Sequence, residues 1–552
     1  MLKRNQSLGH TVQPPRQLEP GESWDYEADV IVIGFGGAGA AAALEAHSQG
    51  KKVIIVERFN GGGATKISGG VVYAGGGTSL QESLGIDDSP KEMYRYLQQE
   101  VQGVVSDDVL QAFCDESSEN FNWLKQQGVE FNGSMCPEKT SYPSNRHYFY
   151  YSGNESFEPY SSKAKPAPRG HRAFGKGVSG RALFKPLQRA VLHRGIQLIQ
   201  QGRACGLIVD KGKRVIGVEF CRINPRGFGR WLHLGLYQTL ISLRYVAIFV
   251  PWLTRLLEAC LGACERRWSE RQLAKASQGV ILATGGFIYN RKMVEHYAPR
   301  YLKGMPLGTV GDQGEGIALG QTVGGSLKHM HRVSAWRFFN PPLAFGHGLL
   351  VGSDGRRICN EMLYGEKIGD QIQRLQDGQG YLIIDYGVWQ RALSQLKPGA
   401  SQWFQIMAGL LYLFVERYKA ASIDDLAQKI GAHPANLRET VETYNGRIRD
   451  GKDDPLGKPS KYQSLVAQAP FYALKMSFDS KWVPCPTLTL GGLRVDDAGR
   501  VLDGAKQPVA GLYAVGRSAV GVSSQGYVSG LSIADCIFSG RRAGRHASMV
   551  SR

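Results

Sequence analysis

The first regular pattern of hydrophobic and polar positions runs from residue 29 to residue 57. An apolar stretch at 29–33 has the length of a buried strand and leads into a glycine-rich turn, 34–39. An alanine-rich stretch follows, and a second apolar stretch at 52–56 ends at Glu57. Apolar runs of strand length on either side of a helical segment predict a β–α–β unit with two parallel strands.

Later stretches of the chain carry the same two signals. Helices are predicted at 90–130 and from residue 181, and strands at 197–201, 214–220, 280–283 and 511–515. A glycine-rich turn and a C-terminal helix follow the last strand. Strands that alternate with helices indicate an α/β fold with a parallel sheet.

Two segments are more apolar than the rest of the chain. The stretch 231–268 is rich in Leu and aromatic residues, but Arg244 and Pro251 divide it into pieces shorter than the ~20 residues that span a bilayer. A shorter stretch, 402–419, has the same character. Both indicate amphipathic helices lying in a membrane interface. A buried helical hairpin or an oligomer interface is the alternative for such a pattern.

Charge and cysteine content narrow the partners. Lys and Arg number 66 against 48 Asp and Glu, a formal net charge of +18, which favours an anionic membrane surface or anionic ligands. We recognise no nucleic-acid motif and expect no nucleic acid partner. The nine cysteines lack CxxC pairs, which predicts reduced thiols and no metal site. Residues 1–22 lack the apolar core of a signal peptide. We therefore expect a cytoplasmic protein that lies peripherally on the inner face of the cell membrane.

The glycine turn has the spacing of a dinucleotide-binding site. Gly34 allows the strand to turn sharply, Gly36 allows a pyrophosphate to approach the backbone, and Gly39 allows the helix to pack closely on the strand. Glu57 ends the second strand about 20 residues later, where an acid accepts ribose hydroxyls. This motif predicts a bound dinucleotide but does not distinguish NAD from FAD.

Further runs resemble one flavoprotein branch, which includes fumarate reductase, succinate dehydrogenase and the 3-ketosteroid dehydrogenases. These runs occur in the order of that branch, at 57–70, 283–286, 311–316, 355–361 and 511–517. The resemblance implies FAD as cofactor, with Leu531 to Ile533 at the isoalloxazine ring. It assigns FAD binding to Gly34, Gly36, Gly37, Ala38, Gly39, Glu57, Arg58, Ala64, Thr65, Ser68, Gly69, Gly70, Ala204, Thr284, Gly285, Asp312, Gly516, Arg517, Leu531, Ser532 and Ile533.

We therefore expect an α/β protein with an α+β cap, in which a smaller substrate-capping domain interrupts a Rossmann-like FAD-binding domain. The predicted divisions are a disordered leader at 1–26, the first part of the FAD domain at 27–325, the cap at 326–475 and the last part of the FAD domain at 476–552. The apolar segments lie within insertions at 222–270 and 399–420.

Departures from the dicarboxylate-specific members of the branch point to a different substrate. Gly63 stands where succinate dehydrogenases carry the His that binds flavin covalently, so we expect FAD to be non-covalent. Leu488 replaces a substrate-binding His, and Tyr364 stands near the place of a catalytic Arg. A buried dicarboxylate needs charged or multiply hydrogen-bonded partners, so these replacements favour a neutral, lipophilic substrate.

The run 61–78 and the terminal run 526–535 resemble the 3-keto-5α-steroid Δ4-dehydrogenases. Desaturation beside a ketone removes a proton from the α carbon and a hydride from the β carbon, and the hydride passes to flavin N5. A base and a carbonyl-polarising group are therefore needed. The resemblance assigns Tyr527 and Ser529 to proton abstraction as a relay, and Tyr364 to the relay or to carbonyl contact.

Other functions remain open from the sequence. They are a 3-ketosteroid Δ1-dehydrogenase, a flavoprotein ene-reductase of the fumarate reductase type, and a non-catalytic flavin-binding membrane subunit. No second complete nucleotide fingerprint follows the first, so we expect the electron acceptor to be a quinone or an electron-transfer protein.

Overall fold

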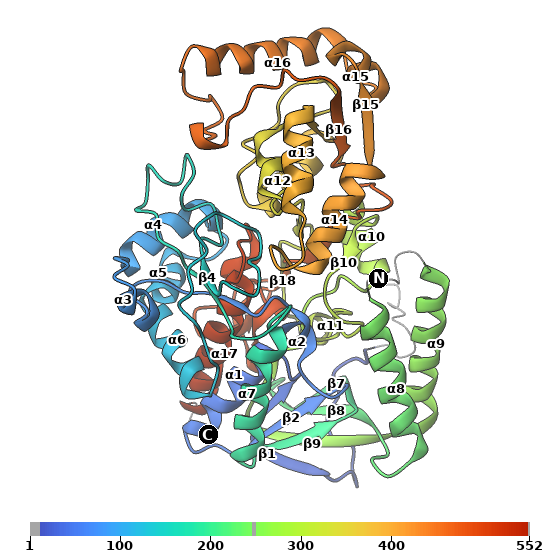
Figure 1. Cartoon of the computed structure of the whole chain (residues 1–552). Helices are drawn as coiled ribbons and strands as arrows, with labels where there is room; N and C mark the ends of the chain where they lie inside the picture. The colour runs from blue at the N-terminus through green and yellow to red at the C-terminus, as the bar shows by residue number, and fades with distance from the viewer. Residues whose placement is uncertain (1–11, 245–249, 550–552) are drawn as a thin grey trace.

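The computed structural model describes residues 12–244 and 250–549, and its base is a sheet in which six strands lie in the order β19-β20-β9-β1-β2-β6. Their bounds are β1 Tyr26–Ile33, β2 Val53–Glu57, β6 Gln197–Gln200, β9 Ser269–Leu282, β19 Arg500–Leu502 and β20 Pro508–Ala514. All pairs in this row are parallel except β19 with β20. Strands from both ends of the chain therefore share one sheet, which confirms the predicted α/β fold (Figure 1).

Two more strands extend this sheet. Strand β8 (Val215–Ile223) pairs antiparallel with the first half of β9, and β7 (Gly202–Val209) pairs antiparallel with β8. The sequence prediction missed β7, which follows β6 after the single residue Gln201. Gln201 has a φ of +57°, a left-handed conformation that turns the chain between the two strands. Gly202 follows the turn and opens β7, a signal that the sequence prediction did not use.

Alternating side chains of β1 face two separate cores. Val30 and Val32 pack with helices α1 (Gly37–Ser48) and α17 (Leu531–Met549), whereas Ile31 and Ile33 pack with β7 and β8. Helices α1 and α17, from opposite ends of the chain, lie side by side (Figure 1). A Cβ on Gly540 would lie 2.5 Å from a backbone oxygen of α1, so glycine permits this close approach.

The N-terminal stretch corrects one expectation. Residues 12–26 lie against the sheet, where Arg16 forms a β-bridge with Ile208 and its Nε donates to Glu219 at 2.9 Å. The predicted disordered leader is therefore wrong for residues 12–26, because ion pairs and strand-edge contacts order a stretch whose composition is polar. Residues 1–11 of that leader lie outside the described residues.

A helical layer and a small sheet flank α1 and α17. The sheet has the order β3-β5-β4, and all its pairs are antiparallel. The elements of this region are α2 Gly63–Ile67, β3 Val71–Tyr73, α3 Ser79–Ser83, α4 Pro90–Val101, α5 Asp107–Asp115, α6 Ser117–Gln126, β4 Phe149–Tyr150, β5 Gly170–Arg172 and α7 Gly180–His193.

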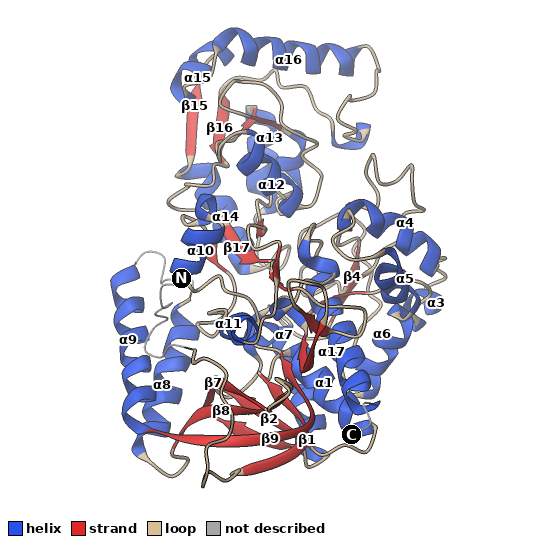
Figure 2. Cartoon of the chain, turned by 180° about the vertical axis from the view of Figure 1, so that it is seen from behind, coloured by secondary structure: helices blue, strands red, loops and turns tan. Residues whose placement is uncertain are grey.

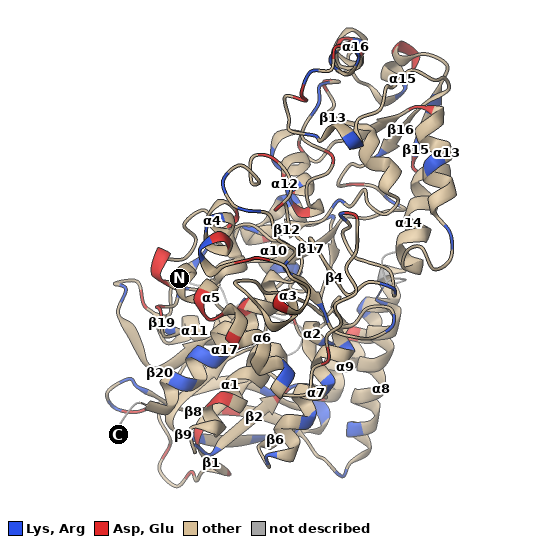
Figure 3. Cartoon of the chain, turned by 60° about the vertical axis from the view of Figure 1, so that its left-hand side comes forward, with Lys and Arg blue, Asp and Glu red and all other residues tan. Residues whose placement is uncertain are grey.

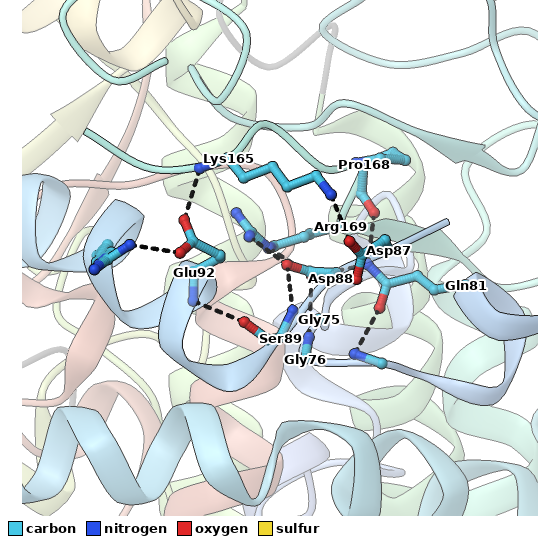
Figure 4. Close-up of polar contacts among 12 residues, drawn as sticks. Gly75, Gly76, Gln81, Asp87, Asp88, Ser89, Glu92, Lys165, Pro168 and Arg169 are labelled. Carbon is cyan, nitrogen blue, oxygen red and sulfur yellow. Dashed lines mark hydrogen bonds and ion pairs between the residues drawn. The ribbon is translucent and has the colours of Figure 1, made fainter. Parts of the chain in front are cut away.

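A buried ion pair fixes the turn that follows β3 (Figure 4). Arg169 donates through Nη2 and Nε to Asp88 at 2.6 and 2.9 Å, and neither side chain is exposed. The same carboxylate accepts the Gly76 N–H and the Gln81 amide, both at 3.0 Å. Removing either charge would leave the other buried and uncompensated. This pair therefore holds the turn after β3 in place.

The cap stands away from the base, at the top of Figures 1 and 2. Its four-stranded antiparallel sheet has the order β13-β14-β16-β15. The elements of the cap are η2 Leu343–His347, β13 Leu349–Val351, α12 Gly365–Leu375, β14 Tyr381–Ile384, α13 Tyr386–Gln395, α14 Trp403–Phe414, β15 Arg417–Ala420, α15 Ile423–Ile430, α16 Pro434–Arg449, η3 Ser460–Tyr462 and β16 Phe471–Lys475.

The apolar insertion predicted at 399–420 is only partly helical. Helix α14 fills its middle, but β15 pairs with β16 inside the cap sheet. The membrane-interface helix predicted for 402–419 is therefore wrong for residues 417–419, because strand pairing with a distant segment determines their conformation.

Short strands connect cap and base. The sheets β10-β17-β12 and β11-β18 bring residues 327–335, which the sequence assigns to the cap, against residues 486–493. The remaining elements are α10 Arg291–Tyr297, η1 Pro299–Tyr301, β10 Met305–Pro306, α11 Glu315–Thr322, β11 Leu327–Lys328, β12 Val333–Ala335, β17 Pro486–Thr489, β18 Gly492–Leu493, η4 Gly516–Ser518 and η5 Val522–Ser524.

The first apolar insertion forms a helix pair. Helices α8 (Phe228–Leu243) and α9 (Pro251–Trp268) stand beside the base sheet, and α14 lies above their upper ends (Figures 1 and 2). Among the described helices, none combines the length and the hydropathy that crossing a bilayer requires.

Candidate active site

One large cavity lies between the base and the cap. Its volume is about 890 Å³, within the roughly 300–1,000 Å³ of small-molecule sites. The glycine turn and Glu57 line one end, and α14 and Trp482 line the other. We call these the dinucleotide end and the substrate end.

The glycine turn has the geometry that a pyrophosphate needs. Gly34 has a φ of +101°, and a Cβ there would lie 2.6 Å from the Ala283 carbonyl oxygen. A Cβ on Gly39 would lie 2.0 Å from the Gly34 oxygen, so this glycine is required for helix–strand packing. Gly36 caps α1 without a side-chain hydrogen bond. The Gly37 N–H donates to Thr65 Oγ1 at 3.0 Å, and the first turn of α1 presents the positive end of its dipole to an anion.

Glu57 is held at the end of β2 by backbone N–H groups. Its carboxylate accepts from Phe35 at 2.7 Å and from Phe59 at 2.8 Å, and the residue is 8% exposed. Burial raises the pKa of Glu57, while these hydrogen bonds oppose the shift. Each oxygen keeps acceptor capacity for a ribose hydroxyl.

Asp312 closes the same end from a distant segment. Its carboxylate accepts from Arg517 Nη2 at 2.7 Å, from the Thr309 N–H at 2.8 Å and from the Gly286 N–H at 3.2 Å. Asp312 and Arg517 both line the cavity. Four separate sequence runs therefore converge here, which is the arrangement that an extended dinucleotide requires.

Most residues that the resemblance assigned to FAD line the cavity. They are Gly34, Gly36, Gly37, Ala38, Glu57, Arg58, Ala64, Thr65, Ser68, Gly69, Gly70, Ala204, Thr284, Gly285, Asp312, Gly516, Arg517, Ser532 and Ile533. Gly39 and Leu531 are not lining residues: Gly39 packs α1 on β1, and Leu531 is fully buried in the core. Arg58 lines the cavity, but its guanidinium is bonded to Glu265 and Glu315.

The substrate end is largely apolar. Leu488 packs with Tyr364, Tyr527 and Leu490 in one buried cluster, against which Trp336 and other apolar side chains lie. The ring of Trp336 stacks on that of Tyr527 with centroids 5.1 Å apart. Leu488, at the position of a substrate-binding His in dicarboxylate reductases, therefore contributes hydrocarbon surface to this end.

Two of the three predicted catalytic side chains, Tyr364 and Tyr527, belong to this cluster, and the third, Ser529, forms a hydrogen bond with Tyr364. Tyr364, Tyr527 and Ser529 all line the cavity, and the rings of Tyr364 and Tyr527 have centroids 6.5 Å apart. Burial raises the pKa of Tyr527, while Arg517 opposes the shift. Burial and the neighbouring phenols of Tyr527 and Tyr150 raise the pKa of Tyr364, and a hydrogen bond with Ser529 opposes it. Both phenols therefore stay protonated at neutral pH.

A buried hydrogen-bond network holds the main chain of Tyr364. Its N–H donates to Asn154 Oδ1 at 2.6 Å, and Asn154 Nδ2 donates to Glu100 at 2.7 Å. Tyr96 donates to the same carboxylate at 2.9 Å. These residues are all buried. A satisfied polar network of this kind limits the freedom of the phenol that it carries.

Sequence reasoning missed two polar residues of the substrate end. Tyr150, fully buried on β4, has its hydroxyl 3.0 Å from Ser529 Oγ and so extends the hydroxyl chain. Arg337 lines the cavity and donates to the carbonyl oxygens of Val483 at 2.6 Å and Ser477 at 2.5 Å. An arginine inside an aromatic run, 336–339, is a signal that could have found Arg337. The substrate end is thus not free of cations.

Within residues 12–244 and 250–549, no group of three or more His, Cys, Asp or Glu is placed to hold a metal ion. The FAD binding domain family matches residues 29–533 of the chain. The glycine turn, the two buried acids and the N-terminus of α1 at the dinucleotide end fit this cofactor.

Known relatives share nearly the whole chain. A 3-oxo-5-alpha-steroid 4-dehydrogenase from Comamonas testosteroni is 38% identical, over 89% of this chain and 93% of the relative. A 3-oxosteroid 1-dehydrogenase from Mycolicibacterium smegmatis is 27% identical, over 89% and 91%. The 3-ketosteroid-delta4-(5alpha)-dehydrogenase from Rhodococcus jostii RHA1, solved in complex with 4-androstene-3,17-dione, has a TM-score of 0.82 at 30% identity, covering 98% of this chain and 100% of that one. The chain therefore belongs to the FAD binding domain family and, within it, to the family of the 3-oxo-5-alpha-steroid 4-dehydrogenases.

Proposed function

We propose that this protein is an FAD-dependent oxidoreductase that desaturates 3-keto-5α-steroids to 4-ene-3-ones. The observation that carries the proposal is that Tyr364, Tyr527 and Ser529 all line the apolar substrate end of a cavity whose other end is the dinucleotide end. The activities of the relatives from Comamonas testosteroni and Rhodococcus jostii support it. FAD, when bound non-covalently, supplies the hydride acceptor.

The side chains divide the proton chemistry in this proposal. Tyr527 and Ser529 take the proton from the carbon next to the ketone as a relay: each hydroxyl that accepts a proton releases its own to the next hydroxyl, and Ser529 releases one toward Tyr150, 3.0 Å away. Tyr364 joins this relay or donates to the ketone oxygen. A buried phenol can serve in either task without placing a permanent charge beside a lipophilic substrate.

An anaerobic bleaching panel tests the function. We expect a saturated 3-keto-5α-steroid to bleach the flavin, and a dicarboxylate to leave it oxidised. The 4-ene-3-one 4-androstene-3,17-dione separates the two regiochemistries, because its C1–C2 bond is still saturated. A Δ1-dehydrogenase would be reduced by it, whereas a Δ4-dehydrogenase would bind it without bleaching. Full FAD occupancy with no bleaching by any steroid would indicate a non-catalytic flavin protein.

We infer that a quinone or an electron-transfer protein takes the electrons from the reduced flavin. The sequence supports this through its single complete nucleotide fingerprint. Reoxidation of the steroid-reduced enzyme by a soluble quinone analogue, but not by NAD, is the expected result. Equal reoxidation by NAD would contradict the inference.

We infer further that the cavity mouth lies against an anionic membrane surface, from which the steroid enters. Large apolar side chains are exposed on both apolar insertions: Trp403 of α14 is 74% exposed, and Trp252 of α9 is 66% exposed. Trp403 also lines the cavity. Exposed aromatic side chains beside basic residues such as Arg255 suit a lipid interface.

Vesicle flotation tests this contact. Replacing both Trp252 and Trp403 by Glu should reduce binding to vesicles that contain anionic phospholipid. Leu192→Glu, a change at a 54% exposed side chain on α7, is the control and should leave binding unchanged. Equal recovery of all three proteins in the unbound fraction would contradict the membrane contact.

A further inference from the structure

The hairpin α8–α9 has two chemically different faces. The buried residues of α8 recur every three or four positions and so lie on one side: Gly229, His233, Tyr237 and Leu240. On the outer side, Phe228 and Trp231 are each 72% exposed. Glu265 of α9 is only 4% exposed. The inner face thus buries ionisable side chains, which membrane binding alone does not require.

Glu265 joins both helices to the residue that follows Glu57. Arg58 donates through Nε and Nη2 to the two oxygens of Glu265, at 2.8 and 3.0 Å, a bidentate pair. His233 Nε2 lies 3.2 Å from the same carboxylate. The other ring nitrogen of His233, Nδ1, lies 3.1 Å from the amide nitrogen of Gln201. Since Nδ1 accepts from Gln201, the ring proton sits on Nε2 and faces Glu265.

The surrounding charges balance within the base. Arg58 Nη1 also donates to Glu315 at 3.0 Å, and Arg203 Nη2 lies 2.7 Å from Glu315. The side chains of these two acids and two arginines are 5–14% exposed. Burial opposes ionisation of Glu265, but Arg58 and His233 hold its pKa below the ordinary value. Neutralising Glu265 would leave buried guanidinium charge uncompensated.

Stacked rings make the second contact between hairpin and base. Tyr237 of α8 stacks on Phe59 with centroids 4.0 Å apart and planes 6° apart. The Phe59 N–H is one of the backbone donors to the Glu57 carboxylate. Tyr237 also forms a hydrogen bond with Thr309, whose N–H donates to Asp312. The hairpin therefore contacts the backbone that holds both buried acids of the dinucleotide end.

We propose that the α8–α9 hairpin is a clasp for the adenosine half of FAD, in which Glu265 and Tyr237 are positioning residues. They hold Arg58 and Phe59 in place and thereby aim the Glu57 carboxylate at the ribose. The clasp acts at the dinucleotide end, remote from the phenols, so it determines how tightly FAD is retained and not how fast a bound steroid reduces it. This inference does not depend on which substrate the enzyme oxidises.

A matched pair of substitutions tests the clasp. Glu265→Gln removes the charge that holds Arg58, and Glu270→Gln makes the same change at an exposed position at the start of β9. We expect Glu265→Gln to raise the Kd for FAD about tenfold or more, where tenfold corresponds to about 1.4 kcal/mol. The control should keep the wild-type Kd, and the two FAD-saturated variants should be reduced by steroid at the same rate. A Kd for Glu265→Gln equal to that of the control would overturn the proposal.

A second variant and a variant-free measurement guard against a folding defect. Tyr237→Leu keeps a buried apolar side chain but removes the ring that stacks on Phe59, and it should weaken FAD binding in the same direction. In the wild-type protein, removing FAD should accelerate hydrogen exchange in α8 and α9, because coupling between two sites is reciprocal. Exchange in both helices that is unaffected by FAD would overturn the clasp, whatever the variants do.

Discussion

The two ends of the cavity hold polar groups in different ways. At the dinucleotide end, Asp312 is paired with Arg517 at 2.7 Å, and Arg58 is paired with Glu265 at 2.8 Å. At the substrate end, Tyr364 and Tyr527 are buried, and burial raises the pKa of each. One end therefore fixes a charged ligand with permanent charges, and the other keeps its reactive groups neutral until a proton moves.

The two apolar helical insertions follow the same division. The hairpin α8–α9 carries Glu265 and His233 on its inner face, against the cofactor loops. Figure 3 shows α14 without Lys, Arg, Asp or Glu, and Trp403, Phe404 and Met407 of this helix line the substrate end. Similar hydropathy in the sequence thus corresponds to two roles. Buried ionisable residues within an apolar run distinguish a segment that packs on a charged site from one that meets a lipophilic ligand.

The largest expected effect is a loss of flavin reduction, without a loss of FAD affinity, when the substrate end is changed. Tyr527→Phe removes the hydroxyl proposed to move the proton, so steroid-driven flavin reduction should fall by about 10²–10⁴-fold. FAD affinity should not change, because Tyr527 belongs to the apolar cluster. Anaerobic stopped-flow absorbance measures the rate, and FAD titration of the apoprotein is the control. A normal reduction rate would remove Tyr527 from the proton path.

The next largest expected effect is a loss of FAD affinity, without a loss of the reduction rate, when the dinucleotide end is changed. Asp312→Asn leaves Arg517 without its carboxylate partner, and breaking a buried pair is strongly unfavourable. We expect FAD affinity to fall by about 10–100-fold, or about 1.4 kcal/mol for each factor of ten. Flavin fluorescence titration measures it. In the FAD-saturated variant the steroid reduction rate should be close to wild type; a rate lost together with affinity would argue against independent ends.

A stability measurement examines the neutral end. Burial raises the pKa of Glu366, two residues after Tyr364, to about 8. A carboxyl whose folded pKa lies above its unfolded value favours the folded state less as pH rises between the two, here from about 4.5 to about 8. Glu366→Gln should therefore have the wild-type Tm near pH 5 and a higher Tm near pH 8.5. The free energy of unfolding at pH 8.5 should exceed that of the wild type by about 1–4 kcal/mol. A Tm difference that does not vary with pH would contradict a neutral Glu366.

The smallest effect concerns the mouth. Met407 of α14 lines the cavity and is 41% exposed, so its contact with a steroid is partial. Met407→Ala should raise the KM for the steroid by about 2–5-fold and leave kcat unchanged, because a contact made equally in ground and transition states affects binding alone. Steady-state kinetics measure both constants. A fall in kcat with unchanged KM would place Met407 in the chemistry instead.

Local signals were enough to predict that Gly34, Gly36 and Glu57 lie close together, and all three line one end of the cavity. Gly34, Gly36 and Glu57 lie within one β–α–β unit, where sequence spacing fixes spatial order. Spacing within one unit does not predict contacts between segments that lie far apart in the sequence. Tyr150 lies in hydrogen-bond contact with Ser529, although 379 residues separate the two in the sequence. The leader was misjudged for the same reason, because Arg16 finds its partner Glu219 across 203 residues.

The most direct test of the central account uses deuterium in the steroid and the bound flavin as the detector. A 3-keto-5α-steroid is deuterated either at C5 or at C1, and flavin bleaching is followed in a single anaerobic turnover. If the phenol-lined end presents the C4–C5 bond for oxidation, deuterium at C5 slows bleaching and deuterium at C1 does not. Slowing by C1 deuterium alone, or no bleaching by either steroid, would contradict the account.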